Sequence, residues 1–163
     1  MARVEHDYYP TPAEAVNVLL RSPWAPPSVC LDPCCGDGAI VRALLASGRW
    51  ASGFDLHPVG AWPQRDALAA APWGCSAVVG NPPYRGAASF VSRALREAPA
   101  YTAMLLRLSW MEPCADRRAL LALHPNVIVL PFRPKFRADR KGSDSVTSAW
   151  FVWPGAGLWS VGK

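Results

Sequence analysis

The sequence predicts an α/β protein with a mostly parallel sheet and helices on both faces of it. Apolar segments of strand length alternate with helical segments along most of the chain, a pattern typical of parallel sheets. Predicted strands end at Asp32, at Asp55 and just before Asn81, which places polar side chains at one edge of the sheet. A loop rather than a helix joins the last two predicted strands, so we expect the final strand to run antiparallel.

Length and composition fit a single domain with its own core. The chain has 163 residues, and 51% of them are hydrophobic, which is enough for a buried core. No apolar run reaches the length of a membrane span, and residues 1–7 lack the apolar stretch of a signal peptide. We therefore expect a soluble, cytoplasmic protein and favour a monomer.

The cysteines and histidines do not indicate a metal site. The five cysteines are an odd number, which favours reduced thiols in an intracellular protein. No pair of cysteines has the spacing of a zinc site, and the three histidines are scattered along the chain. We therefore expect no bound metal.

The first helix carries the clearest local signals. Thr11 is the expected N-cap, Pro12 takes the first helical position, and Glu14 completes a capping box. The helix is expected to end before Pro23.

Apolar periodicity, together with the positions of glycine and proline, predicts the remaining elements. Residues 56–75 are too short and too irregular to supply a full strand–helix unit. The predicted strands cover 28–32, 50–55, 76–80, 101–108, 126–130 and 146–153, and the further helices cover 39–47, 87–98 and 117–123.

The loop after the first strand suits a cofactor with a positive charge better than one with a pyrophosphate. Gly36 and Gly38 let the backbone approach a ligand closely, but Val41 stands where a dinucleotide fold would place a third glycine. Asp32 is unfavourable for a pyrophosphate and suits an ammonium group, as in the methionine part of S-adenosylmethionine. Asp55 is placed to accept hydrogen bonds from ribose hydroxyls.

The tetrapeptide Asn81-Pro82-Pro83-Tyr84 is the most specific chemical signal in the chain. The two prolines fix the backbone and remove two donors. The Asn81 side chain and the Pro82 carbonyl can then both accept hydrogen bonds from one amino group, which localises its lone pair on nitrogen. Tyr84 offers a flat face to the attached ring, and positioning against a sulfonium methyl supplies most of the rate without a strong base. The alternative interpretation is an ordinary proline-rich turn.

In this order, the motifs resemble those of class I S-adenosylmethionine-dependent amino-methyltransferases, in particular the small phage or prophage DNA N6-adenine methyltransferases. The resemblance covers nearly the whole chain and implies a Rossmann-like methyltransferase domain with S-adenosylmethionine as cofactor. It implies catalysis by Asn81, Pro82, Pro83 and Tyr84, and cofactor binding by Tyr9, Thr11, Asp32, Pro33, Cys34, Gly36, Gly38, Asp55, Asp66 and Asn81.

Two features depart from this resemblance. Many relatives carry a separate target-recognition domain, and we find none, so a short or relaxed recognition sequence is expected. Pro33-Cys34 matches the nucleophile dipeptide of cytosine C5 methyltransferases, but it stands in the cofactor loop rather than after the third strand. We therefore interpret Cys34 and Cys35 as packing and loop residues.

The net charge of +5 is concentrated in residues 133–141. An adenine in duplex DNA must be flipped out before its amino group can react, and a basic loop near the site would bind the flanking phosphates. The alternative is a solvated loop. The predicted nucleic-acid-binding residues are Arg133, Lys135, Phe136, Arg137, Arg140 and Lys141.

The sequence leaves other functions open, because one fold serves many substrates. The same tetrapeptide occurs in methyltransferases that modify adenine or guanine in RNA, or glutamine in protein. A catalytically inactive nucleic-acid-binding module and a dehydrogenase are further alternatives. We favour transfer of a methyl group to the N6 amino group of adenine in DNA.

Overall fold

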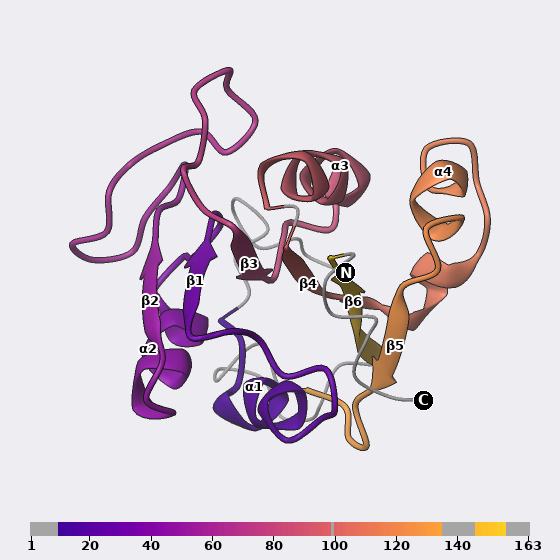
Figure 1. The fold of residues 1–163 in the computed structure, drawn as a ribbon, viewed down its shortest axis with the longest axis horizontal. Helices are drawn as coiled ribbons and strands as arrows, with labels where there is room; N and C mark the ends of the chain where they lie inside the picture. The colour runs from indigo at the N-terminus through magenta and orange to yellow at the C-terminus, as the bar shows by residue number, and fades with distance from the viewer. Residues whose placement is uncertain (1–9, 99, 135–145, 156–163) are drawn as a thin grey trace.

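The computed structural model describes residues 10–98, 100–134 and 146–155. Its helices and strands alternate along the chain (Figure 1). The elements are α1 (Ala13–Leu20), β1 (Val29–Asp32), α2 (Ala39–Ala46), β2 (Trp50–Gly53), β3 (Ala77–Gly80), α3 (Ala87–Glu97), β4 (Tyr101–Arg107), the 3₁₀ helix η2 (Leu108–Met111), α4 (Arg118–Leu121), β5 (Asn126–Val129) and β6 (Ser148–Pro154).

Six strands form one mixed sheet in the order β2-β1-β3-β4-β6-β5. Strands β2, β1, β3 and β4 run parallel to one another. Strand β6 pairs antiparallel with both β4 and β5. The predicted α/β class and the predicted antiparallel last strand are therefore confirmed.

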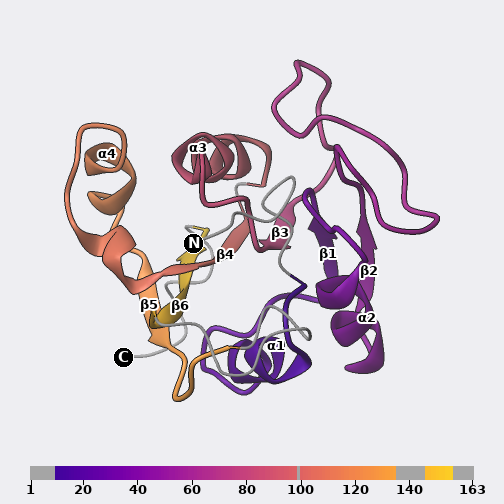
Figure 2. The same ribbon diagram turned by 180° about the vertical axis from the view of Figure 1, so that it is seen from behind.

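Helices cover the sheet on two sides (Figures 1 and 2), with α1 and α2 on one face and α3 and α4 on the other. Alternate residues of β4 enter different cores. Met104 and Leu106 pack with residues of α3 and α4, whereas Ala103 and Leu105 pack with residues of α1 and α2. This alternation follows from the period of two in a strand, and it explains why β4 reads as an unbroken apolar run.

The start of the first helix differs from the prediction. The helix begins at Ala13 with Pro12 as its N-cap, and no side chain caps it. The predicted capping box is therefore wrong. The hydroxyl of Thr11 instead accepts a hydrogen bond from Asn81, 70 residues further along the chain.

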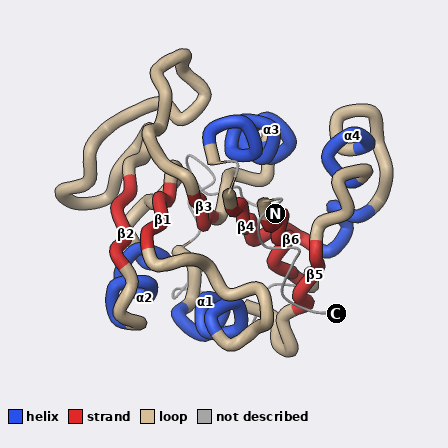
Figure 3. Tube along the Cα trace, in the orientation of Figure 1, coloured by secondary structure: helices blue, strands red, loops and turns tan. Residues whose placement is uncertain are grey.

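The long connection between β2 and β3 contains neither helix nor strand, as expected for residues 56–75 (Figure 3). One isolated parallel bridge, between Asp55 and Gln64, holds it near the sheet. The other predicted elements are present with ends that differ by a few residues, the usual uncertainty of element boundaries. No helix in the described parts of the chain is long and apolar enough to cross a membrane.

Candidate active site

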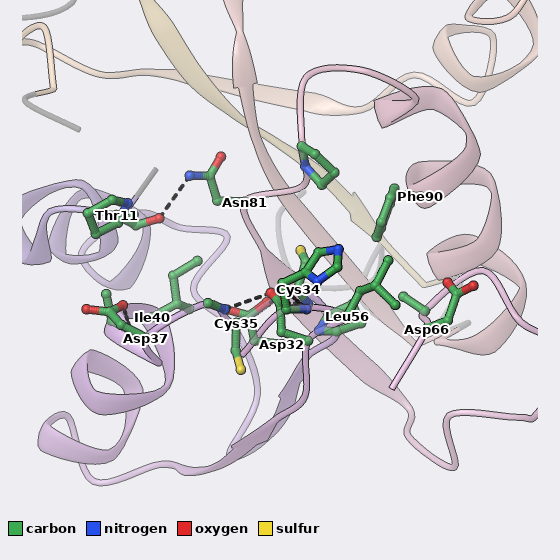
Figure 4. A pocket seen from close by; sticks show the side chains of 18 of the residues that line it. Thr11, Asp32, Cys34, Cys35, Asp37, Ile40, Leu56, Asp66, Asn81 and Phe90 are labelled. Atoms are coloured by element: carbon green, nitrogen blue, oxygen red, sulfur yellow. Dashed lines mark hydrogen bonds between the residues drawn. The ribbon is translucent and has the colours of Figure 1, made fainter. Parts of the chain in front are cut away.

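A cavity of about 380 Å³ lies at the carboxyl ends of β1, β2 and β3. This is the edge at which ligands bind in open parallel sheets. Asp32, Asp55 and Asn81 all line it, so the three predicted strand ends do meet at one place. Figure 4 shows Thr11, Asp32 and Asn81 around this space, with Asp66 and Phe90 on its far side.

The loop after β1 is fastened to the end of β2 through the carboxylate of Asp55. The Gly36 amide donates a hydrogen bond to Asp55 Oδ2 at 2.8 Å, and the His57 amide donates one to Oδ1 at 2.8 Å. The Cys35 amide donates to the Phe54 carbonyl at 3.1 Å. Asp55 therefore shapes the loop and faces the cavity at the same time.

Gly38 acts through packing rather than by lining the cavity. It has a φ of 82° and forms the N-cap of α2. A Cβ atom there would lie 2.1 Å from the Trp62 ring, which is far inside a van der Waals contact. Both the left-handed backbone and the nearby Trp62 ring therefore explain why glycine stands at position 38.

Asp32 is a buried carboxylate facing the cavity. Its side chain is 1% exposed, and its Oδ1 accepts a hydrogen bond from the Cys34 amide at 3.1 Å. Burial raises the pKa of Asp32 to about 7, and the nearby Asp55 and Asp37 add to the rise. Within the described residues, no cationic side chain pairs with Asp32. A carboxylate in this state would be stabilised by a cation from a ligand.

Gly80 makes room for Asp32, a relationship that the sequence does not reveal. A Cβ atom at position 80 would lie 3.2 Å from Asp32 Oδ1 and 3.4 Å from Cys34 Sγ. Two neighbouring strands therefore approach closely just before the tetrapeptide, and the pairing of β1 with β3 brings this about.

The tetrapeptide follows β3 directly and lies at the cavity. Asn81 Nδ2 donates a hydrogen bond to Thr11 Oγ1 at 3.1 Å, and Asn81 and Pro83 line the cavity. Pro82 is buried. Tyr84 is half-buried and outside the cavity lining, and its ring is covered on one face by the guanidinium of Arg107, 4.2 Å from the ring centroid.

Apolar side chains form part of the cavity wall. Asp66 lies among them at the cavity, where its Oδ1 accepts a hydrogen bond from the Leu68 amide at 2.8 Å. The sequence interpretation missed these apolar residues, although Leu56 could have been found because it follows Asp55 directly. They are Ile40, Leu56, Ala67, Leu68 and Phe90.

The thiols beside the cavity are not activated. Burial and the neighbouring Asp32 raise the pKa of Cys34 well above its usual value. Burial raises the pKa of Cys35 to about 12. Thiolates are the nucleophilic form of cysteine, so these pKa values support the interpretation of both residues as packing and loop residues.

Only part of the predicted nucleic-acid surface falls in the described chain. Arg133 is exposed and lines a second, more open hollow with the starts of α1 and α2. That hollow shares Pro10 and Thr11 with the first cavity. The residues that lie outside the described part of the chain are Tyr9, Lys135, Phe136, Arg137, Arg140 and Lys141.

Among the described residues, no group of His, Cys, Asp or Glu side chains could hold a metal ion.

Comparison of the fold identifies its class. No family model and no curated protein sequence matches the chain. Solved structures do match. A proposed class I S-adenosylmethionine-dependent methyltransferase of Listeria monocytogenes is similar at a TM-score of 0.63 and 14% identity, over 94% of this chain and 62% of the other. The chain has the Rossmann-like class I methyltransferase fold.

Two further methyltransferase structures show the same similarity. A proposed RNA methyltransferase of Pyrococcus horikoshii has a TM-score of 0.65 and 13% identity, over 94% of this chain and 90% of that one. The methyltransferase subunit of a type I restriction-modification system of Streptococcus thermophilus has a TM-score of 0.64 and 14% identity, over 91% of this chain and 45% of that one. The chain thus spans less than two thirds of two of these three proteins.

Proposed function

We propose that this protein transfers a methyl group from S-adenosylmethionine to the exocyclic N6 amino group of adenine in DNA. The observation that carries the proposal is that Asn81 and Pro83 of the tetrapeptide line a cavity that Asp32 and Asp55 also line. An amine-orienting segment and a cofactor-sized space thus share one edge of a methyltransferase fold. The similarity to a restriction-modification subunit favours DNA as the substrate.

The cavity has the chemistry that S-adenosylmethionine requires. The buried carboxylate of Asp32 suits the cofactor's ammonium group, and Asp55 suits its ribose hydroxyls. The apolar wall, with Leu68 and Phe90, suits the adenine ring, and Asp66 supplies an acceptor for its amino group. The volume of about 380 Å³ lies in the range of ligand pockets. When bound, the cofactor supplies an electrophilic methyl group on sulfur.

The protein's own residues then orient the nucleophile. Asn81 Oδ1 and the Pro82 carbonyl accept hydrogen bonds from the two protons of the target amine, and Tyr84 stacks on the target ring. An amine held in this way points its lone pair at the methyl group, and positioning accounts for most of the acceleration. The nitrogen loses its proton after it has attacked, so no strong base is needed.

Transfer of tritiated methyl groups to unmethylated DNA tests this function. The wild-type protein should label DNA, and Asn81→Ala should abolish the label while still binding the cofactor. Label found in RNA or in protein, but not in DNA, would show that the substrate is wrong. Absence of any S-adenosylmethionine binding would overturn the proposal as a whole.

RNA is the second candidate substrate, because the Pyrococcus structure is similar over most of both chains. Parallel assays with DNA and RNA oligonucleotides of the same sequence separate the two. Chromatography of the digested product shows whether the label is on N6 of adenine or on the amino group of guanine.

A further inference from the structure

We propose that Thr11 is a positioning residue for catalysis, because its hydroxyl holds the Asn81 side chain in place at the cavity. This inference rests on the proposed function. The resemblance to known methyltransferases assigns Thr11 to the cofactor instead, so the two roles predict different outcomes for the same variants.

The contact between Thr11 and Asn81 is well defined. Thr11 is 6% exposed, and its Oγ1 accepts a hydrogen bond of 3.1 Å from Asn81 Nδ2. Figure 4 shows the amide nitrogen of Asn81 turned toward Thr11 and the amide oxygen turned the other way. Both residues line the cavity.

The chemical consequence lies in the two ends of the amide. The oxygen of an asparagine side chain accepts hydrogen bonds, and its NH2 group donates them. An exocyclic amine is also a donor of two protons, so an amide turned by 180° would oppose donor to donor. In the observed arrangement the Thr11 hydroxyl bonds to the NH2 end of the amide, and loss of this bond would release the Asn81 side chain from its position.

The position of Thr11 in the fold allows little freedom. It stands directly before Pro12, the N-cap of α1, and Ala15 and Val16 of that helix are fully buried. Its hydroxyl does not cap the helix, although the sequence signals a capping box. The Thr11 hydroxyl therefore bonds to Asn81, the residue that follows β3, instead of capping its own helix.

Two substitutions at this position separate the positioning of Asn81 from cofactor binding. Thr11→Val keeps the shape of the side chain but removes the acceptor, and Thr11→Ser keeps the acceptor. We expect Thr11→Val to lower kcat by about tenfold, the effect of losing one net hydrogen bond that holds Asn81 in position. The Kd for S-adenosylmethionine, measured by calorimetry, should stay within about twofold in both variants.

Thr11→Ser should restore kcat to near the wild-type value, and both variants should retain a cooperative thermal transition. A Thr11→Val variant with wild-type kcat would overturn the inference. A weaker cofactor Kd at unchanged kcat would also overturn it, and would favour the cofactor role for Thr11.

A measurement without substrate keeps the inference testable if methyl transfer is never observed. In ¹⁵N-labelled protein, the side-chain NH2 of Asn81 should exchange slowly with solvent in the wild type and in Thr11→Ser, and faster in Thr11→Val. Asn126→Asp, at the start of β5, serves as a control that should leave the Asn81 signals in place. Equal exchange rates of the Asn81 NH2 protons in wild type and Thr11→Val would refute the inference about Thr11. Failure of the proposed function would be seen separately, as wild-type protein that transfers no methyl group.

Discussion

The guanidinium carbon of Arg107 lies 4.2 Å from the centroid of the Tyr84 ring. Arg107 is the last residue of β4, and Tyr84 is the last residue of the tetrapeptide after the neighbouring strand β3. The cation covers one face of an electron-rich ring, a geometry that is attractive in proteins. The face of Tyr84 that Arg107 covers is therefore not available for stacking by a substrate ring.

Removal of this cation should weaken the substrate complex. A cation–π contact contributes about 0.5–2 kcal/mol, so we expect Arg107→Gln to raise the KM for oligonucleotide by about twofold to thirtyfold. The Kd for S-adenosylmethionine should not change, because neither residue lines the cofactor cavity. Arg96→Gln, near the far end of α3, is the matched control with the same loss of charge. An equal rise in KM for both variants would indicate that the loss of positive charge, and not the contact with Tyr84, causes the effect.

The two halves of the site should respond to mutation in opposite ways. Tyr84→Ala should lower turnover far more than it weakens cofactor binding, because the proposed role of Tyr84 is to stack on the target ring. Asp55→Ala should mainly weaken cofactor binding. The loss of affinity should exceed that of one ribose contact, because the substitution also removes the acceptor of the Gly36 and His57 amides. Calorimetry and steady-state kinetics on both variants check this pair of outcomes. Parallel losses of both properties in both variants would mean that the half-sites are misassigned.

The position of Gly38 against Trp62 predicts a loss of stability. Gly38 and Gly48 have nearly the same backbone, with φ of 82° and 83°, but a Cβ would meet the Trp62 ring at position 38 and nothing at position 48. Gly48→Ala should cost about 1–2 kcal/mol for the left-handed conformation alone. Gly38→Ala should cost more, and the excess should shrink when Trp62 is also replaced by Ala. Urea denaturation of the three variants measures these differences, and equal costs at both glycines would contradict the packing role of Trp62.

Local patterns were enough to predict the sheet and its polar edge. Asp32, Asp55 and Asn81 each lie at the end of an apolar strand-length run, and parallel strands place such positions at one edge of the sheet. The adjacency of β2, β1 and β3 then brings them together. The cofactor edge was therefore predictable before any contact was known. The tetrapeptide led to the proposed chemistry in the same way, because its residues are consecutive.

Long-range contacts were not predictable from such patterns. Thr11, Pro12 and Glu14 form a capping-box sequence, yet the Thr11 hydroxyl bonds to Asn81. Nothing local to Arg107 indicates that its side chain covers Tyr84. The role of Phe90 at the cavity depends on how α3 packs on the sheet. These relationships arise from tertiary packing, which overrides local preference.

Asp32 makes cofactor binding depend on pH in a way that can be measured. Its pKa in the folded protein is raised by burial to about 7, and only the carboxylate form attracts an ammonium group. The affinity for S-adenosylmethionine should therefore increase as pH rises from about 6 to 7.5, and fall again when the cofactor's own amino group, near the ordinary α-amino pKa of about 8, loses its proton. Asp32→Asn should bind weakly and lack the rising limb. Asp116→Asn, which replaces an exposed carboxyl outside the cavity lining, should keep the rising limb.

Asp32 should also determine how the stability of the cofactor-free protein changes with pH. Because the folded pKa of about 7 lies above the ordinary aspartate value of 3.8, the folded state retains a proton that the unfolded state has lost between these two values. The stability that this proton confers is fully present below pH 3.8 and is lost as pH rises through 7. Thermal unfolding of the cofactor-free protein should therefore show a Tm contribution that declines from pH 5 to pH 8 and is absent in Asp32→Asn. Saturating S-adenosylmethionine should raise the Tm most at the alkaline end of this range, since it supplies the cation that the carboxylate lacks. A wild-type Tm difference from Asp32→Asn that stays constant across the range would show that Asp32 is ionised throughout and would remove the basis for this linkage.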